Sequence, residues 1–334
     1  KGNGTLTSPN IQGAVSLKDG LYENGTIGML LREIKAELGL SGKSLVVRSF
    51  EGKDYDKGSF GVTGRVTFPE LSAPGLNLDL ALQKVIVSNT HEAIVVTSGK
   101  LSARTKKPHH HRIQGDVHVN SALINLNQVS SEPKTIRTFR TEEELDRKQA
   151  KKATELLTQL DIKIDIPKKL YVQGFGLRSE WKGNMTVVGP LNMPNIAGGV
   201  NSLSGRLDLS SKKLVLAPSS VTFETKHGQI MPVLDVTAKK VVREYEAFIS
   251  VKGHVDEPKI DFTSIPAQST ENVIALILFD KPINEVTAAQ SLQLATTLAA
   301  VKAGKFSGGA LDSLNHLLGV DDISLNKQEA MDGS

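Results

Sequence analysis

The sequence predicts a mainly β fold, in which an elongated and curled antiparallel sheet carries a small helical segment near the C-terminus. Apolar and polar residues alternate in many short runs up to about Thr263, and several of these runs open with a glycine. Successive strand side chains point to opposite faces, so each run has one apolar face. After Pro266 the composition shifts to longer runs that favour helices.

The glycine-led runs are the most regular element of the pattern. We expect each glycine in a turn or bulge before its strand, where a positive φ is needed. The runs are "GAVSL" (13–17), "GRVTF" (64–68), "GKLSA" (99–103), "GDVHV" (115–119), "GNMTV" (183–187) and "GRLDL" (205–209). Strands without the glycine are expected at 34–40, 213–218, 221–224, 234–238, 248–253 and 259–262, with turns at "KDG", "SGK", "SSKK" and "EPK".

Helices are expected in two regions. Residues 141–160 are rich in helix formers and place acids before bases, which predicts a solvated helical insertion; a partner-binding or mobile segment is the alternative. In the second region, Ser269 or Thr270 can cap a helix that Pro282 stops, and further helices are expected in 284–304 and 308–319. They either pack over one end of the sheet, or they plug a groove or meet the outer membrane leaflet.

Composition excludes several classes of protein. The 334 residues contain 40 basic and 36 acidic residues, a balance that does not favour nucleic-acid binding. The absence of cysteine excludes disulfides, thiol nucleophiles and cysteine-bound zinc. The longest apolar run, 273–279, is far shorter than the ~20 residues of a membrane span. Because the chain starts without methionine, we expect it to be a fragment, which leaves room for a membrane anchor upstream of it.

No motif supports catalysis, a cofactor or a metal, and the protein is expected not to be an enzyme. Gly174 and Gly176 lack the third glycine and the following helix of a dinucleotide site. His109 and His111 would share a strand face, but zinc needs three or four converging ligands. We therefore expect "PHHHR" in an exposed strand or loop. Neither a nucleophile elbow nor a P-loop is present.

Longer motifs resemble a known family. The stretches "LYVQGFGLRSEWKGNMTVVG", "PNIAGGVNSLSGRLDLSSKKLVLAPSSVTFE" and "ENVIALILFDKPINEVTAAQSLQLATTLAAV", followed by "LLGVDDISL", resemble the C-terminal region of the TamB family over about 170–325. This resemblance implies an inner-membrane-anchored periplasmic protein that works with the outer-membrane protein TamA. It further implies an AsmA-like bridge-type lipid transfer protein with an apolar β-groove, the β-taco, and a link to assembly of outer-membrane β-barrel proteins and autotransporters.

On this basis we expect four regions: a β-repeat groove with its helical insertion at 1–167, a C-terminal β-taco region at 168–263, a helical segment at 264–320, and the start of terminal strands at 321–334. Trp181 either lines the groove or packs where the sheet bends. No catalytic, cofactor-binding or metal-binding residue is predicted. The residues expected to line a lipid groove are Val15, Leu17, Val66, Phe68, Val117, Val119, Met185, Val187, Leu207, Leu209, Ile249 and Val251.

Three functions are compatible with this reading. The first is a periplasmic conduit that shields phospholipid acyl chains between the inner and outer membranes. Burial of a methylene stabilises by ~0.8 kcal/mol, so about thirty of them hold a two-chain lipid out of water by about 24 kcal/mol. The second is an assembly factor that receives unfolded outer-membrane proteins by β-augmentation and acts with a TamA-like partner. The third is a structural spacer.

Overall fold

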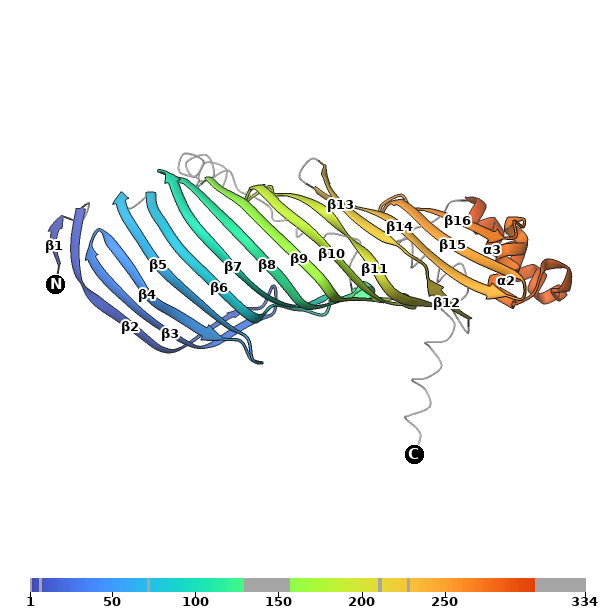
Figure 1. The fold of residues 1–334 in the computed structure, drawn as a ribbon, viewed down its shortest axis with the longest axis horizontal. Helices are drawn as coiled ribbons and strands as arrows, with labels where there is room; N and C mark the ends of the chain where they lie inside the picture. Colours follow the sequence, from blue (N-terminus) through green and yellow to red (C-terminus); the bar gives the residue numbers. More distant parts are fainter. Residues whose placement is uncertain are drawn as a thin grey trace, which may run out of the picture.

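One long sheet dominates the structure. The computed structural model describes residues 2–5, 8–70, 73–128, 157–209, 212–226 and 229–303. The described strands form a single 16-stranded sheet in which spatial order follows chain order, except that β13 pairs with both β11 and β14. Figure 1 shows the strands succeeding one another along the long axis, with the helices at the far end. The expected mainly β, curled fold is confirmed.

The strands are long, and most pair with their neighbours through tight turns. Their bounds are β1 Gly2–Thr5, β2 Ser8–Asn24, β3 Met29–Gly42, β4 Ser44–Lys53, β5 Ser59–Glu70, β6 Ala73–Asn89, β7 Ala93–Lys107, β8 His110–Asn125, β9 Leu157–Gly174, β10 Leu177–Pro190, β11 Asn195–Leu209, β12 Lys212–Leu216, β13 Ser220–Lys226, β14 Gln229–Val242, β15 Tyr245–His254 and β16 Lys259–Ile265. A short 3-10 turn, η1 (Leu126–Gln128), follows β8.

A parallel pair interrupts the antiparallel order. β8 and β9 run in the same direction, with His110 opposite Leu157 and Val117 opposite Ile164. Leu157–Leu160, expected at the end of a helix, instead begin β9. The helix prediction is therefore wrong for these residues, and its part at 141–156 lies outside the described residues. The expected division between residues 167 and 168 falls within β9, at a point where its pairing with both β8 and β10 is irregular.

The turn between β9 and β10 explains the "GFG" motif. Phe175 and Gly176 form a two-residue turn with φ values of 49° and 78°, as in the type I′ turns that join adjacent strands. A Cβ on Gly176 would lie 2.1 Å from the carbonyl oxygen of Asp208. The Asp208 amide donates to the Gly176 carbonyl at 2.9 Å. The motif is thus a hairpin turn held against β11.

The repeated glycines lie inside strands and not in turns, so the turn half of the prediction is wrong, but Gly64, Gly99 and Gly183 adjoin register shifts, as the bulge alternative expects. Gly115 is in the interior of β8 with a φ of 153°. A Cβ at this position would meet the carbonyl oxygen of Lys100, on the neighbouring strand, at 2.1 Å. Close approach of two strand backbones therefore requires a residue without a side chain. Likewise, "KDG" lies within β2 and forms an irregularity in its pairing with β3.

Irregular pairing recurs at about the same position along several neighbouring strands. Register shifts occur between Arg32 and Lys35 in β3, Leu82 and Val85 in β6, and His118 and Ala122 in β8. A further shift at this level separates Trp181 from Gly183 on β10. A β-bulge bends its strand and increases the local twist. A succession of such shifts along neighbouring strands bends the sheet along a line, which we call the crease.

The helices confirm the expected start of the C-terminal segment. α2 (Thr270–Phe279) begins after Ser269, whose side chain accepts a hydrogen bond from the Asn272 amide. η3 (Ile283–Glu285) and α3 (Ala288–Ala303) follow. The third expected helix and the terminal strands lie outside the described residues.

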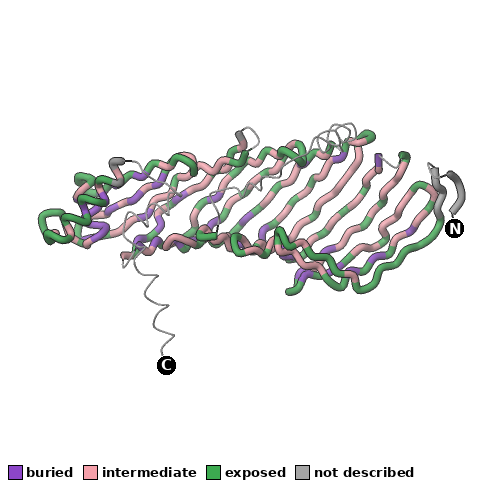
Figure 2. Tube along the Cα trace, turned by 180° about the vertical axis from the view of Figure 1, so that it is seen from behind, coloured by how far each residue is buried: buried purple, intermediate pink, exposed green. Residues whose placement is uncertain are grey.

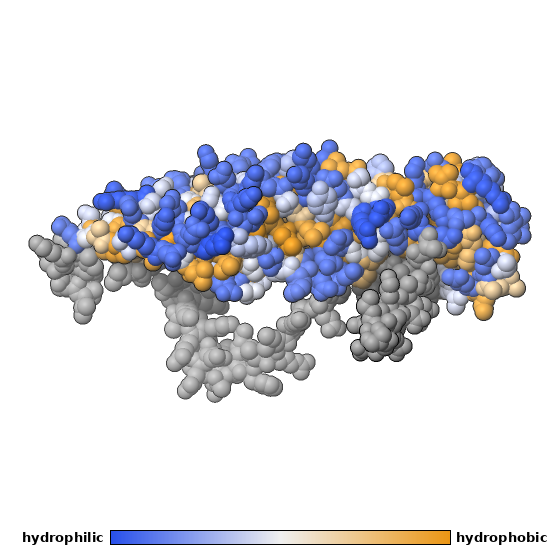
Figure 3. Space-filling model, turned by 90° about the horizontal axis from the view of Figure 1, so that it is seen from below, coloured by the Kyte–Doolittle hydropathy of each residue, from blue (hydrophilic) through white to orange (hydrophobic). Residues whose placement is uncertain are grey.

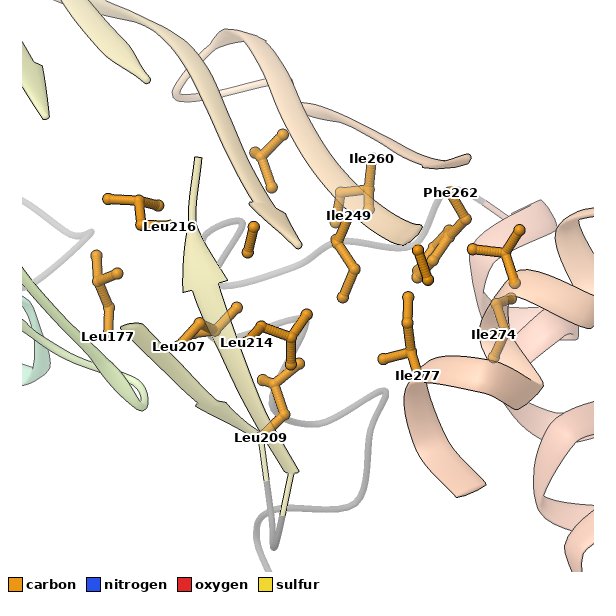
Figure 4. Packing of buried hydrophobic residues seen from close by; sticks show 14 of the residues in the cluster. Leu177, Leu207, Leu209, Leu214, Leu216, Ile249, Ile260, Phe262, Ile274 and Ile277 are labelled. Carbon is orange, nitrogen blue, oxygen red and sulfur yellow. The ribbon is translucent and has the colours of Figure 1, made fainter. Parts of the chain in front are cut away.

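α2 fills the end of the sheet. Its apolar residues from Val273 to Ile277 are all 0% exposed, as expected of a helix that is apolar all round. They join one core with residues of β11, β12, β15 and β16, and Figure 4 shows Ile274 and Ile277 beside Ile249 and Phe262. α2 therefore packs over one end of the sheet.

Ion pairs hold the C-terminal end of α2 to the sheet. Asp280 caps the helix with a φ of 60° and pairs with Lys212 of β12 and Lys240 of β14. Lys240 also donates to the Ile277 carbonyl at 3.1 Å. Burial raises the pKa of Asp280, but the hydrogen bonds from Lys212 and Lys240 outweigh it and lower the pKa overall.

This cluster predicts a pH-dependent contribution to stability. Because the folded pKa of Asp280 is lowered, its contribution is present above the unfolded value of about 3.9 and is lost as the pH falls through the folded pKa. Asp280 is 46% exposed, so we expect only about 0.2–1 kcal/mol. Urea unfolding of wild type and Asp280→Asn should differ at about pH 6 and converge at about pH 2.5. A constant difference at both pH values would contradict this role.

Candidate functional site on the inner face

The strand register gathers apolar residues on one face of the sheet, here called the inner face. Cross-strand partners share a face, so the register can be followed from strand to strand. One such row passes through Leu17, Ala36, Phe50, Val62, Leu80, Leu101, Gly115, Ile162, Val187 and Ile196. The next row passes through Gly52, Phe60, Leu82, Gly99, Val117, Ile164, Met185, Gly198, Phe223 and Pro232.

The inner face is the concave side of the crease. Inner residues at the crease are almost fully buried, including Val85 at 2%, Ile166 at 4% and Trp181 at 2% exposed. Outer neighbours at the same level, such as Lys84 and Lys182, are exposed. Away from the crease, inner residues such as Ile162 and Val187 are only partly buried. A bend buries side chains on its inside and exposes those on its outside, so the apolar rows lie on the inside of the bend, and this apolar surface is here called the trough.

The outer face has the opposite character. The row beside Val187 and Ile162 passes through Lys35, Glu51, Gly61, Ala81, Lys100, Asp116, Lys163 and Thr186. Figure 2 shows exposed and partly buried positions along most strands, with buried positions most frequent toward the helical end. From below, apolar side chains appear in patches between polar ones along the length of the molecule (Figure 3).

Trp181, the single tryptophan, marks the floor of the bend. It lies beside the bulge on β10, is 2% exposed, and donates from Nε1 to Ser179 Oγ at 2.8 Å. Of the two roles considered for it, packing where the sheet bends is the one that the structure supports.

This burial predicts weak access of solutes to the indole. Iodide should quench Trp181 fluorescence far less than that of free tryptophan amide, since a hydrated anion cannot reach a side chain that is 2% exposed. The control carries Trp181→Phe with Leu292→Trp, which moves the indole to a position that is 73% exposed. Equal quenching in the two proteins would contradict a closed crease.

The twelve residues predicted to line the groove all belong to the inner face by register, but they differ in burial. Val15 and Leu17 are 49% and 44% exposed near the sheet edge. Val66, Phe68, Val117, Met185 and Val187 are partly buried. The remaining five are buried in protein contacts: Val119, Leu207, Leu209, Ile249 and Val251. The open part of the trough therefore lies between β2 and β11, and the core around α2 fills its C-terminal end.

Sequence reasoning missed several inner residues in the open part. Leu160, Ile162, Ile164 and Ile166 of β9 face inward beside Ile113 and Val117 of β8. The signal was present in "LDIKIDI", which alternates strictly. The expectation of a helix ending at Leu160 obscured it.

The histidine run is more buried than expected. His111 is 4% exposed, and its Nδ1 lies 2.7 Å from Thr105 Oγ1. Burial lowers the pKa of His111, and the neighbouring His109 and His110 lower it further. The expectation of an exposed site is therefore wrong for His111. Among the described residues, no group of three or more histidines, aspartates or glutamates is arranged to hold a metal ion.

Comparison with known families identifies the family of this chain. Residues 48–333 match the TamB C-terminal domain. The chain belongs to the TamB family. The match includes most of the open part of the trough as well as the C-terminal helices. TamB membership implies a role in the outer-membrane translocation and assembly module, with a TamA partner, and the family is not known for enzymes. Within the described ranges, no helix has the length and apolarity to cross a membrane.

Proposed function

We propose that this TamB chain shields the acyl chains of phospholipids in the trough on their way between the inner and outer membranes. The observation that carries the proposal is the pair of unbroken apolar rows on the concave side of the sheet. These rows continue across strands from widely separated parts of the chain. No strand interrupts them with a charged residue between β4 and β11.

The energetic argument favours lipid over a small polar ligand. Each buried methylene stabilises by ~0.8 kcal/mol, and a two-chain lipid with about thirty of them needs a continuous apolar surface in place of a single pocket. The trough offers that surface along about eight strands, each about 4.8 Å from the next. It also leaves one side open, so a headgroup can stay in contact with water.

Photo-crosslinking in living cells tests the proposal. A photoreactive residue at Val187 faces the trough, whereas one at the adjacent Thr186 faces the outside. We expect covalently attached phospholipid at Val187 and none at Thr186. Equal labelling at both sites, or labelling at neither, would overturn the proposal. Crosslinks from Val187 to nascent β-barrel proteins would favour the assembly-factor alternative.

A further inference from the structure

The sheet bends at the tip of the hairpin formed by β4 and β5. β4 stops at Lys53 and β5 starts at Ser59, whereas the flanking strands β3 and β6 continue past this turn. Both flanking strands are irregular there, since Glu33 of β3 and Lys84 of β6 have positive φ values of 51° and 53°. Such irregularities bend a strand. The tip of the β4–β5 hairpin therefore lies at the crease.

Beneath this turn the two flanking strands come together. β3 and β6 lie close to each other although two strands separate them in the sheet. The Asn89 amide at the end of β6 donates to the Ile27 carbonyl, just before β3, at 2.8 Å. A Cβ on Gly28 would lie only 1.9 Å from the carbonyl oxygen of Asn89. The lower parts of β3 and β6 are therefore held together beneath the β4–β5 turn.

Asp54 joins this turn to β6. The residue is 1% exposed. Its Oδ1 accepts hydrogen bonds from the amides of Asp56 and Gly58 at 2.9 and 2.8 Å. Its Oδ2 accepts a hydrogen bond from the Ile86 amide at 2.9 Å. Burial of a carboxylate is costly unless hydrogen bonds satisfy it, as these three amides do. One oxygen therefore shapes the turn, and the other ties the turn to the strand beyond the bend.

Arg32 of β3 holds the same turn from the other side. Its Nε and Nη2 donate to the carbonyls of Asp54 and Tyr55, both at 3.0 Å. The Ile86 amide takes its acceptor from the turn because β6 extends beyond the start of β5, its neighbour on that side. A buried amide without a partner is costly, so the Asp54 carboxylate takes the place of a strand here.

The inner face carries a small core at this bend. Phe50 and Phe60 pack there with Ile34 and Val85, and the two phenylalanine ring centroids lie 5.7 Å apart. These residues fill the floor of the trough between β3 and β6. Ile34 and Val85 directly follow the two residues with positive φ. The packing of this core therefore depends on the bend of both flanking strands.

We propose that Asp54 is a positioning residue for the lipid trough. By tying the β4–β5 turn to Ile86, it fixes the bend of the sheet and, through the phenylalanine core, the shape of the trough floor beside Val62. Its role is indirect, since the carboxylate is bonded to backbone amides and closed off from solvent. The inference rests on the proposed function and adds a residue that keeps the N-terminal part of the trough in its lipid-binding shape.

A distance measurement tests whether Asp54 fixes the bend. The sequence contains no cysteine, so Arg65→Cys on β5 and His91→Cys in the turn after β6 place two spin labels at exposed sites on either side of the bend. Asp54→Asn keeps one acceptor oxygen but sets an NH2 donor against an amide. We expect the distance distribution to broaden and its mean to lengthen. The matched control, Asp56→Asn, removes the same charge from an exposed side chain of the same turn and should change neither.

Photo-crosslinking in living cells connects the bend to lipid binding. Val62 and Val187 lie in the same apolar row, on β5 beside the bend that Asp54 holds and on β10 far from it. With a photoreactive residue at either site, Asp54→Asn should lower phospholipid labelling at Val62 several-fold and leave labelling at Val187 unchanged. Asp56→Asn should leave both unchanged.

The outcomes separate this inference from the proposed function. Absence of phospholipid label at both sites in wild type overturns the proposed function, and the lipid role of Asp54 with it. When wild type is labelled, an unchanged distance distribution in Asp54→Asn overturns this inference alone. So does a longer distance with unchanged labelling at Val62. Equal loss of labelling at Val62 and Val187 shows that Asp54 supports stability in general, which also overturns the inference.

Discussion

Replacing Leu276 by alanine should lower the free energy of unfolding by about 2–5 kcal/mol. Leu276 is 0% exposed in the middle of α2, where it packs into the core that joins this helix to β11, β12, β15 and β16. The truncation removes apolar contacts and leaves a cavity that close-packed neighbours fill only partly. Urea unfolding followed by circular dichroism measures the change.

Leu292 supplies the matched control for this prediction. It is also a leucine in a helix, but it is 73% exposed on α3. Leu292→Ala should change the free energy of unfolding by no more than about 0.5 kcal/mol. Similar effects of the two substitutions would show that α2 does not close the end of the sheet as described here.

Replacing Val187 by arginine should weaken phospholipid binding at least tenfold while the sheet still folds. Val187 is partly buried on the apolar wall of the trough, between Ile162 and Ile196. A guanidinium there either displaces acyl chains or is buried against them without a partner, and burial of an unpaired charge is costly. Because the trough is open, the long side chain can reach water in the lipid-free protein.

The control for this prediction is Thr186→Arg, which adds the same charge to the outer face one residue away. It should leave phospholipid binding unchanged. Equal loss of binding in both variants would contradict the assignment of the inner face. Leu209→Arg is not an equivalent test, since Leu209 is 1% exposed and an arginine there would destabilise the core.

Within this fold, the assignment of faces could be predicted from the sequence because strand alternation has a period of two residues. Val117 and Val119, or Met185 and Val187, must share a face whatever their partners are. A slip of one residue would reverse a whole strand, and only pairing determines the register. The structure pairs Val117 with Ile164, and Ile164 with Met185. The apolar residues that alternate within single strands are thereby aligned into rows that continue from strand to strand.

The bend of the sheet could not be predicted in the same way. A bulge is a mismatch between two strands, so residues such as Lys84 or Lys169 give no local sign of their positive φ. The burial of Trp181 and Ile166 depends on this bend. The same holds for His111, which is 4% exposed and whose hydrogen-bond partner Thr105 lies on the adjacent strand.

By itself, the sequence determined that this protein is a long sheet with one apolar face and a capped apolar helix after Ser269, because local periodicity and capping chemistry are properties of neighbouring residues. The tertiary structure alone decided which parts of that face stay open. Leu209 and Ile249 alternate as regularly as Val187 does, yet they are covered by residues of α2, while Val187 is not. Whether an apolar residue is covered depends on which distant segment packs on it. The hydrophobic effect favours such packing however far apart the two segments are along the chain.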